Sequence, residues 1–325
     1  MERIAFFNQM GITQDLALEA HELLRGATRK EVPGVIEEKE QFPKSTVTTI
    51  TIIDPIGEKM MGKARGTYIT IESPALKQND PEAHQEISQL IAQKLQMMMQ
   101  KLGTTAGVVL LVGLGNWEAT PDALGPRVIE HTFITRHLHQ YAPQVIPQNW
   151  RSVCAVAPGV MGLTGIETAE IIKGVVERIK PALIIAIDAL AAQNVKRISA
   201  TIQLADTGIN PGSGIGNPRA GINLQTIGIP VIAIGVPTVV HAAVIAYEIF
   251  NQMRAGNPAL NNVLPPPVVQ NSISQVLAPF GGNLTVTPKE IDDLIQRISR
   301  VVSLGINQGL YPEASVEEIT SLTNL

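Results

Sequence analysis

The sequence of 325 residues has few charged and few aromatic side chains, 17% and 4%, whereas 45% of its residues are hydrophobic. Soluble domains carry about 25% charged residues on average, so this chain has an apolar surplus. Intrinsic disorder is excluded, because it needs low hydrophobicity and a high net charge. The single cysteine, Cys154, excludes a disulfide framework. The net charge of −4 gives no basic face, and we expect no direct nucleic-acid partner.

The longest hydrophobic stretch, residues 229–250, is long enough to cross a bilayer. It contains two prolines, a histidine and a glutamate, however, and its first half is short and rich in β-branched residues. This pattern favours a buried strand, a turn at Pro237 and a packed helix. The N-terminus has neither a long apolar segment nor a small-residue cleavage site, so no signal peptide is expected. With one cysteine as well, we expect a cytoplasmic protein without membrane contact.

A β-α-β rhythm begins at residue 108. Short apolar runs predict strands at 108–112, 153–156, 182–187, 198–204 and 231–234, with helical patterns at 123–138, 166–179 and 239–253. Such alternation predicts an α/β fold with a mostly parallel twisted sheet and helices on both faces. Two β-branched runs, 46–53 and 67–71, predict a small antiparallel addition. Residues 255–285 are rich in Pro, Asn and Gly, which indicates an irregular or mobile excursion.

Two acids stand where such a sheet places its sites, outside the carboxyl ends of the strands. Asp188 directly follows the predicted strand 182–187, and Asp122 lies in the loop after the predicted strand 108–112. Either acid could instead have a structural role, as a helix N-cap or a hydrogen-bonded buried group.

Two carboxyl groups that face one cleft would differ in charge, because neighbouring like charges disfavour each other. The ionised carboxylate could activate water as a general base, and the protonated group could assist the leaving group. The same two acids could equally bind a divalent metal, so a metal-dependent hydrolase or protease is an alternative.

Glycine-rich segments suggest nucleotide binding but lack its full signatures. Gly113-Leu114-Gly115 is similar to the start of a dinucleotide fingerprint, but Glu118 stands where the third Gly or Ala belongs. The run 212–219 lacks the Gly-Lys-Ser/Thr of a P-loop. A non-enzymatic α/β ligand-binding module built around the first run is the second alternative.

The histidines do not suggest a metal site. His137 and His139 are two residues apart, so on a helix they point about 200° apart and cannot share a metal. We therefore expect no metal site built on these histidines. Our prediction for the chain is no metal ligand and no cofactor.

Six long segments spread over nearly the whole chain carry a family resemblance. They are QDLALEAHEL (14–23), VGLGNWEATPDALGPRV (112–128), APGVMGLTGIET (157–168), IDALAA (187–192), TIQLADTGINPGSGIGNPR (201–219) and VTPKEIDDLI (286–295). These segments resemble the germination proteases of spore-forming bacteria, which degrade small acid-soluble spore proteins during germination. The resemblance implies an atypical aspartic endopeptidase, made as an inactive zymogen, with Asp122 and Asp188 as the catalytic pair. It further implies the fold of the hydrogenase maturation proteases, a homotetramer and a location in the spore core.

The resemblance also implies a cleavage site in the chain itself. The family removes a short propeptide by self-cleavage after an acidic residue, in a segment like residues 15–19 here. We therefore expect the bond between Asp15 and Leu16 to be cut, which divides the chain into a propeptide, 1–15, and one α/β protease domain, 16–325. The substrates carry a similar signature of an acid, a large apolar residue, Ala and another acid.

An acidic residue on the amino side of the cut calls for a basic pocket. Arginines near the proposed site loops are the candidates. We take Arg127 and Arg219 as substrate-binding residues. Arg136 and Arg197 are alternatives, and the sequence does not decide among the four.

Overall fold

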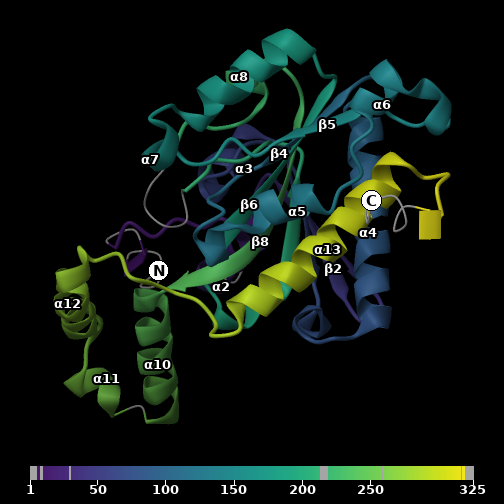
Figure 1. Cartoon of the computed structure of the whole chain (residues 1–325). Coiled ribbons are helices and arrows are strands. Elements are labelled where there is room, and N and C mark those ends of the chain that lie inside the picture. The colour runs from purple at the N-terminus through teal and green to yellow at the C-terminus, as the bar shows by residue number, and fades with distance from the viewer. Residues whose placement is uncertain are drawn as a thin grey trace.

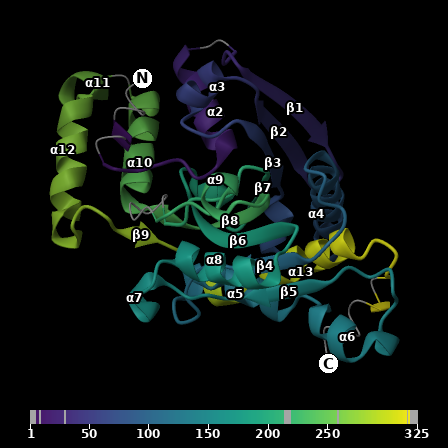
Figure 2. The same cartoon turned by 90° about the horizontal axis from the view of Figure 1, so that it is seen from above.

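The computed structural model describes residues 6–7, 10–28, 31–212, 219–257, 259–315 and 317–318. Within these residues, nine strands form one sheet in the order β1-β2-β3-β7-β8-β6-β4-β5, with β9 paired to β8. Helices cover both faces of the sheet, and a group of helices stands apart from it in both views (Figures 1 and 2).

The strands are β1 (Val35–Gln41), β2 (Thr46–Ile52), β3 (Gly66–Glu72), β4 (Val109–Gly113), β5 (Val153–Val156), β6 (Leu183–Ala192), β7 (Thr201–Ala205), β8 (Val231–His241) and β9 (Thr285–Val286). The α-helices are α2 (Ala17–Thr28), α3 (Pro55–Met61), α4 (Pro81–Lys101), α5 (Leu124–Glu130), α6 (Arg136–Tyr141), α7 (Met161–Thr164), α8 (Thr168–Ile179), α9 (Leu224–Ile227), α10 (Ala242–Gly256), α11 (Leu260–Val263), α12 (Pro266–Leu277) and α13 (Ile291–Leu310). Short 3₁₀ turns are η1 (Pro74–Lys77), η2 (Thr120–Asp122), η3 (Pro143–Val145), η4 (Val195–Arg197) and η6 (Ala278–Phe280).

The α/β class is confirmed, but the prediction of a mostly parallel sheet is wrong. Only β4-β5, β4-β6 and β6-β8 pair in parallel among the described strands, and the other pairs are antiparallel. The chain between β6 and β7, residues 193–200, is too short for the crossover helix that a parallel return needs. Strand β7 therefore runs back antiparallel to β8. It joins the predicted antiparallel pair, confirmed as β2-β3, to the parallel strands.

Strand β8 continues where a turn was predicted. Pro237 lies inside the strand, at the point where the register between β6 and β8 shifts after Leu190. A proline has no N–H to give to a ladder, and a bulge is one place where a strand tolerates it. The Pro237 carbonyl accepts a hydrogen bond from the Ser199 amide at 2.7 Å, so this group is satisfied. The predicted turn at Pro237 is therefore wrong.

The segment 255–285 is helical rather than irregular. It contains α11 and α12, and α12 begins at Pro266, a position where proline suits a helix. Val269, Ile273 and Leu277 recur at four-residue spacing, are buried, and pack with residues of α10. The Pro and Asn content concealed this amphipathic pattern, so the expected irregular excursion is corrected to a helical unit formed with α10 (Figure 1).

The two faces of the sheet have separate cores. Helices α4, α5 and α13 pack on one face, around residues such as Leu111, Ile185 and Ile298. Helices α8 and α9 pack on the other face, where Ile172 and Ile227 meet Val112 and Ile184. In the described part of the chain, no helix combines the length and the apolar character needed to cross a membrane.

Helix α5 approaches the sheet so closely that it needs a glycine. A Cβ on Gly125 would lie 2.4 Å from the Leu114 carbonyl oxygen and 2.5 Å from that of Ile187. We predict that Gly125→Ala forces α5 away from the sheet and lowers the free energy of unfolding by about 1–3 kcal/mol. Gly174→Ala, in exposed α8 where a Cβ meets open space, should instead add about 0.5–1 kcal/mol. Denaturant unfolding measures both, and equal effects would contradict the close approach.

Candidate active site

Asp188 lies inside strand β6, not after it as the sequence predicted. On one side β6 pairs with β8 as far as Ala192, with Asp188 opposite Gly235. On the other side β4 ends at Gly113, opposite Ile187. The strand that ends at this point is therefore β4. Because β4 stops at Gly113, it does not pair with β6 at Asp188, which leaves space beside that residue. The Asp188 side chain is buried, and its Oδ1 accepts a hydrogen bond from the Ala189 amide at 2.9 Å.

Asp122 ends the 3₁₀ turn η2 in the loop that follows β4. Its Oδ2 accepts a hydrogen bond from the Asn116 amide at 2.8 Å. The loop folds tightly, because a Cβ on Gly115 would lie 1.8 Å from the Asp122 carbonyl oxygen. Gly115 has a φ of +111°, which favours glycine. The close contact with the Asp122 backbone therefore explains this glycine. Nucleotide binding is not needed to explain it.

The pKa values of the two acids are raised to different extents. Burial and the nearby charges of Asp122 and Asp15 raise the pKa of Asp188 well above its usual range. Burial also raises the pKa of Asp122, but the hydrogen bond from Asn116 lowers it. Asp188 therefore holds its proton to a higher pH, and Asp122 is the first of the two to ionise. Such a pair could provide one proton donor and one base, the two groups that acid–base chemistry needs.

The segment around Asp15 is bound along the end of the parallel strands. The Asp15 Oδ2 accepts a hydrogen bond from the Ala191 amide at 2.9 Å. The Asp15 carbonyl oxygen accepts from Lys63 Nζ at 2.9 Å and from Gln203 Nε2 at 3.3 Å. The Ala17 amide donates to Gln203 Oε1 at 2.6 Å. Both peptide groups that flank residue 16 are thus held by side chains of the sheet and of the loop before β3.

The chain is not helical where it passes the acids. Residues 12–16 have no regular structure, and α2 begins only at Ala17. The Leu16 side chain is fully buried. A pocket of about 390 Å³ lies beside this segment, and its lining includes residues 12–15, Lys63, Tyr68 and Gln203. An irregular segment that lines a pocket and lies near Asp188 is a geometry that could present a peptide bond for hydrolysis.

A second acid of the segment is buried further along. The Glu19 carboxylate accepts from the Gln193 amide at 2.9 and 3.0 Å and lies 3.6 Å from Arg197. Arg197 also forms two hydrogen bonds of 2.7 Å with Glu22 and one of 2.8 Å with Glu72. Burial outweighs these partners and raises the pKa of Glu19 to about 7.

Lys63, the cation that donates to the Asp15 carbonyl oxygen, was not predicted from the sequence. Arg127 pairs with Glu130 at 2.9 Å and lies over the ring of Trp117, while Arg219 lies 3.8 Å from Glu167. The roles of Arg127 and Arg219 in binding substrate stay predictions. Arg197, an alternative in the sequence analysis, binds acids of α2 instead.

The other missed residue, Gln203, carried a signal in the sequence. It stands in the middle of a predicted apolar strand, where a buried amide needs hydrogen-bond partners. Lys63 is a single lysine in a short loop, and no spacing distinguishes it.

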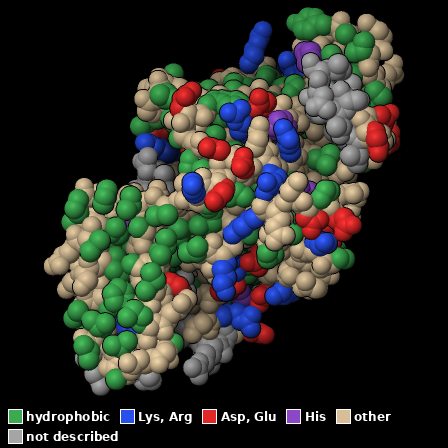
Figure 3. All heavy atoms as spheres, turned by 60° about the horizontal axis from the view of Figure 1, so that its bottom comes forward, with side chains coloured by type: hydrophobic (Ala, Val, Ile, Leu, Met, Phe, Trp, Pro, Cys, Tyr) green, Lys and Arg blue, Asp and Glu red, His purple; other side chains and the backbone are tan. Residues whose placement is uncertain are grey.

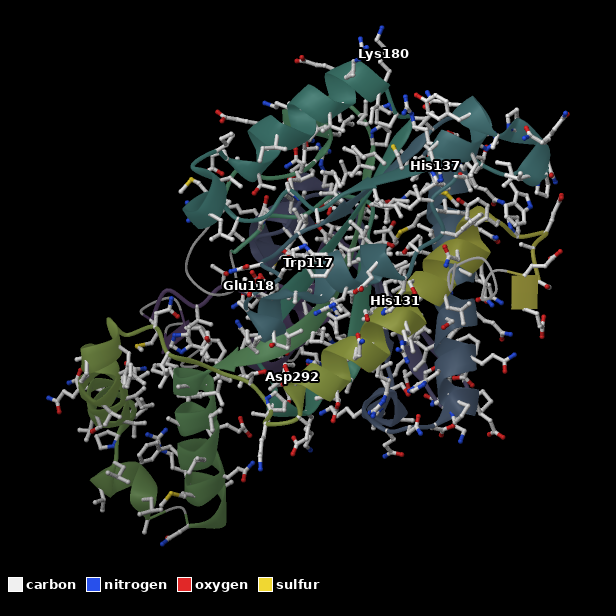
Figure 4. The ribbon with its side chains drawn as sticks, in the orientation of Figure 1. Trp117, Glu118, His131, His137, Lys180 and Asp292 are labelled. Atoms are coloured by element: carbon white, nitrogen blue, oxygen red, sulfur yellow. The ribbon has the colours of Figure 1, made fainter. Side chains whose placement is uncertain are left out.

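The described residues contain no group of three or more His, Cys, Asp or Glu side chains arranged to hold a metal ion. Trp117 and Glu118 lie on the loop that leads to η2, whereas His137 lies on α6, well away from them (Figure 4). His139 belongs to the same helix, so this pair of histidines is remote from the acids' loop.

Comparison with known proteins defines the class of the chain as a peptidase. Residues 13–254 and 262–323 match the family described as germination protease. A germination protease of Caldanaerobacter subterraneus is 46% identical over 323 residues, covering 96% of this chain and 98% of the relative. Germination proteases of Clostridium tetani and Bacillus cereus are 43% and 37% identical, covering 97% and 98% of this chain and 100% and 98% of their own lengths. The chain belongs to the germination protease family.

The raised pKa of Glu19 predicts a pH-dependent stability. The folded chain keeps the Glu19 proton between its ordinary pKa of 4.5 and about 7, where the unfolded chain has lost it. This contribution is complete below pH 4.5 and is lost as the pH rises to about 7, a change of up to about 3 kcal/mol. Glu19→Gln should therefore flatten the fall in melting temperature over this interval.

Glu22→Gln is the matched control for this experiment. The Glu22 side chain is half-exposed and binds the same Arg197, so its loss should leave the pH slope in place. Thermal unfolding of the three proteins from pH 4.5 to 8 measures the effect. An unchanged slope in Glu19→Gln would contradict the assignment.

Proposed function

We propose that the protein is an aspartic-type endopeptidase that begins the degradation of small acid-soluble spore proteins during germination. Its membership of the germination protease family gives the activity class. The single observation that carries the aspartic chemistry is geometric: the buried Asp188 of β6 lies beside the turn η2, which ends at Asp122. The expected site of action is the spore core.

The proposed chemistry is direct attack by water. The Asp122 carboxylate takes a proton from water, whose oxygen attacks the carbonyl carbon of the substrate. The protonated Asp188 gives its proton to the departing nitrogen. No covalent enzyme intermediate forms. Burial supports this assignment, because it keeps a proton on one carboxyl group and limits competing water.

We further propose that the chain is a zymogen that cuts itself between Asp15 and Leu16. The support is the position of this bond: Asp15 is close enough to raise the pKa of Asp188 by its charge, and its backbone is held by Lys63 and Gln203. Residues 1–15 would be the propeptide and residues 16–325 the protease domain. The bound segment, Asp15-Leu16-Ala17-Leu18-Glu19, has the acid, the large apolar residue and the Ala that we expect of the substrates, with the second acid one residue later, after Leu18.

Contacts before the proposed cut support a propeptide that is docked on the protease domain. The side chains of Phe6 and Phe7 are fully buried, and the Phe6 ring stacks on Tyr247 of α10 with centroids 4.7 Å apart. The Thr13 carbonyl accepts a hydrogen bond from Gln193 Nε2 at 3.2 Å. Such contacts would keep the scissile bond at the acids until it is cut.

Assembly as a homotetramer is part of the same proposal. Hydrophobic side chains gather over the helical unit α10–α12, and few charges interrupt them (Figure 3). Val263, Val276 and Phe280 are each more than half exposed there. A surface of this kind is suited to contact with a second copy of the chain. Sedimentation velocity would measure the assembly directly.

The central test replaces each acid by its amide. We predict that Asp122→Asn and Asp188→Asn each give a folded protein that keeps residues 1–15 and loses at least about 10³-fold in cleavage rate, because the base or the proton donor is gone. Intact mass spectrometry follows the removal of the N-terminal segment, and a spore-protein substrate follows cleavage in trans.

The matched control is Asp54→Asn, which makes the same chemical change at an acid that caps α3. Its cleavage rate should stay within about twofold, since asparagine also caps helices well. Normal cleavage by both site variants would contradict the aspartic mechanism. Loss of wild-type activity in a chelator, restored by a divalent metal, would instead favour the metal-dependent alternative.

A further inference from the structure

We propose that Lys63 and Gln203 form an oxyanion site, which stabilises the negative charge on the carbonyl oxygen of the bond being cut. This step rests on the proposed function, because it takes the bond between Asp15 and Leu16 as one that the enzyme hydrolyses. Lys63 and Gln203 would then be catalytic residues in addition to the two acids.

The geometry that carries the proposal is the pair of donors on one oxygen. The Asp15 carbonyl is the acceptor half of the scissile peptide group. Lys63 Nζ lies 2.9 Å and Gln203 Nε2 3.3 Å from its oxygen. The donors come from different parts of the fold, Lys63 from the loop between α3 and β3 and Gln203 from β7. Two preorganised donors that converge on one carbonyl oxygen are the usual means of stabilising a tetrahedral intermediate.

The orientation of the Gln203 amide is fixed by its second partner. The backbone amide of Ala17 can only donate, so the atom that faces it at 2.6 Å must be the Gln203 carbonyl oxygen. The amino group of Gln203 is then directed to the Asp15 oxygen. Gln203 is buried, which limits other orientations. The Gln203 side chain thus forms hydrogen bonds with the peptide on both sides of Leu16, and its amino group donates to the carbonyl oxygen that would react.

Lys63 adds a full positive charge at the same oxygen. Its side chain is partly buried and lines the pocket, where charges interact more strongly than in bulk water. Burial lowers the pKa of Lys63, whereas the charges of Asp15 and Glu19 raise it. A segment with acids at both positions would therefore favour the charged form of Lys63 when it binds. The acidic residues of the substrate would in this way help to keep Lys63 charged at the carbonyl oxygen.

The complete reaction needs only water, the two acids and these donors. Asp122 takes one proton from water, the water oxygen bonds to the Asp15 carbonyl carbon, and the π electron pair moves to the carbonyl oxygen. Lys63 and Gln203 stabilise that charge. The electron pair then returns, the carbon–nitrogen bond breaks, and Asp188 gives its proton to the Leu16 nitrogen. The new carboxyl group loses its proton to solvent, and the proton on Asp122 passes back to Asp188.

The test uses the full chain with Lys63→Met or Gln203→Glu. The methionine removes the charge at similar length. The glutamate keeps an acceptor for the Ala17 amide but replaces the donor on the Asp15 oxygen. We expect each to slow self-cleavage about 10²–10³-fold, followed by intact mass spectrometry. With a peptide of residues 10–24 as substrate and the chain 16–325 as enzyme, kcat should fall by this factor while KM changes less than about threefold.

Lys94→Met is the matched control. Lys94 is on α4, pairs with Glu40 and has no contact with the segment, so its rates should stay within about twofold. Lys63→Arg should recover part of the loss, because a cation is restored. Circular dichroism and melting temperature verify the fold of each variant. If Lys63→Met does not fold, Gln203→Glu alone decides.

The outcomes distinguish a failure of the oxyanion site from a failure of the proposed function. Unchanged kcat in Lys63→Met and Gln203→Glu, with Asp122→Asn inactive, overturns the oxyanion site and leaves the proposed function in place. A raised KM with unchanged kcat also overturns it, since Lys63 would then only bind the acidic residue. Activity in the aspartate variants as well would overturn the proposed function itself.

Discussion

Burying a carboxyl group between the layers of a protein is unfavourable unless the group keeps its proton or finds a partner. Asp188 meets this constraint inside a strand whose neighbours are otherwise apolar. The Ala189 amide donates a hydrogen bond to its Oδ1, and two further acids lie near enough to oppose its ionisation. The fold thus makes Asp188 keep its proton to a higher pH than the neighbouring Asp122, which ionises more readily.

The unequal lengths of the central strands create the space for this arrangement. Strand β4 ends at Gly113, while β6 and β8 continue side by side for several more residues. The part of β6 beyond β4 offers the backbone amides of Ala191 and, just past the strand, Gln193, and these bind Asp15 and Glu19. The antiparallel strand β7 supplies Gln203. Residues 15–19 are therefore bound mainly by backbone amides and a few side chains of the sheet.

Apolar strands followed by acids limit where an α/β site can form, so the sequence pointed to Asp122 and Asp188, whose catalytic role stays a prediction. It was sufficient for the antiparallel pair of β2 and β3. It did not predict the direction of β7, which depends on a short connection, or the extension of β6, which depends on pairing with a strand distant in the sequence. The role of Lys63 could not be predicted, because only the folded chain brings it to Asp15.

The surplus of apolar residues also has a structural explanation. Much of it lies in strands covered on both faces, and another part gathers on the exposed surface of α10–α12 (Figure 3). Low overall charge leaves few acids inside the fold. Among the described residues, the two acids in the buried class are Asp188, in the candidate site, and Glu19, in the segment bound beside it.

Oxygen-18 labelling tests the central claim, that water activated by the paired aspartates attacks the bond directly. A single round of self-cleavage in H₂¹⁸O, analysed by peptide mass spectrometry, follows the label. The account predicts one ¹⁸O atom in the new α-carboxyl group of Asp15 in the released segment and none in Asp122 or Asp188. Label in either aspartate after one turnover, with unlabelled Asp15, would show a covalent intermediate and contradict it.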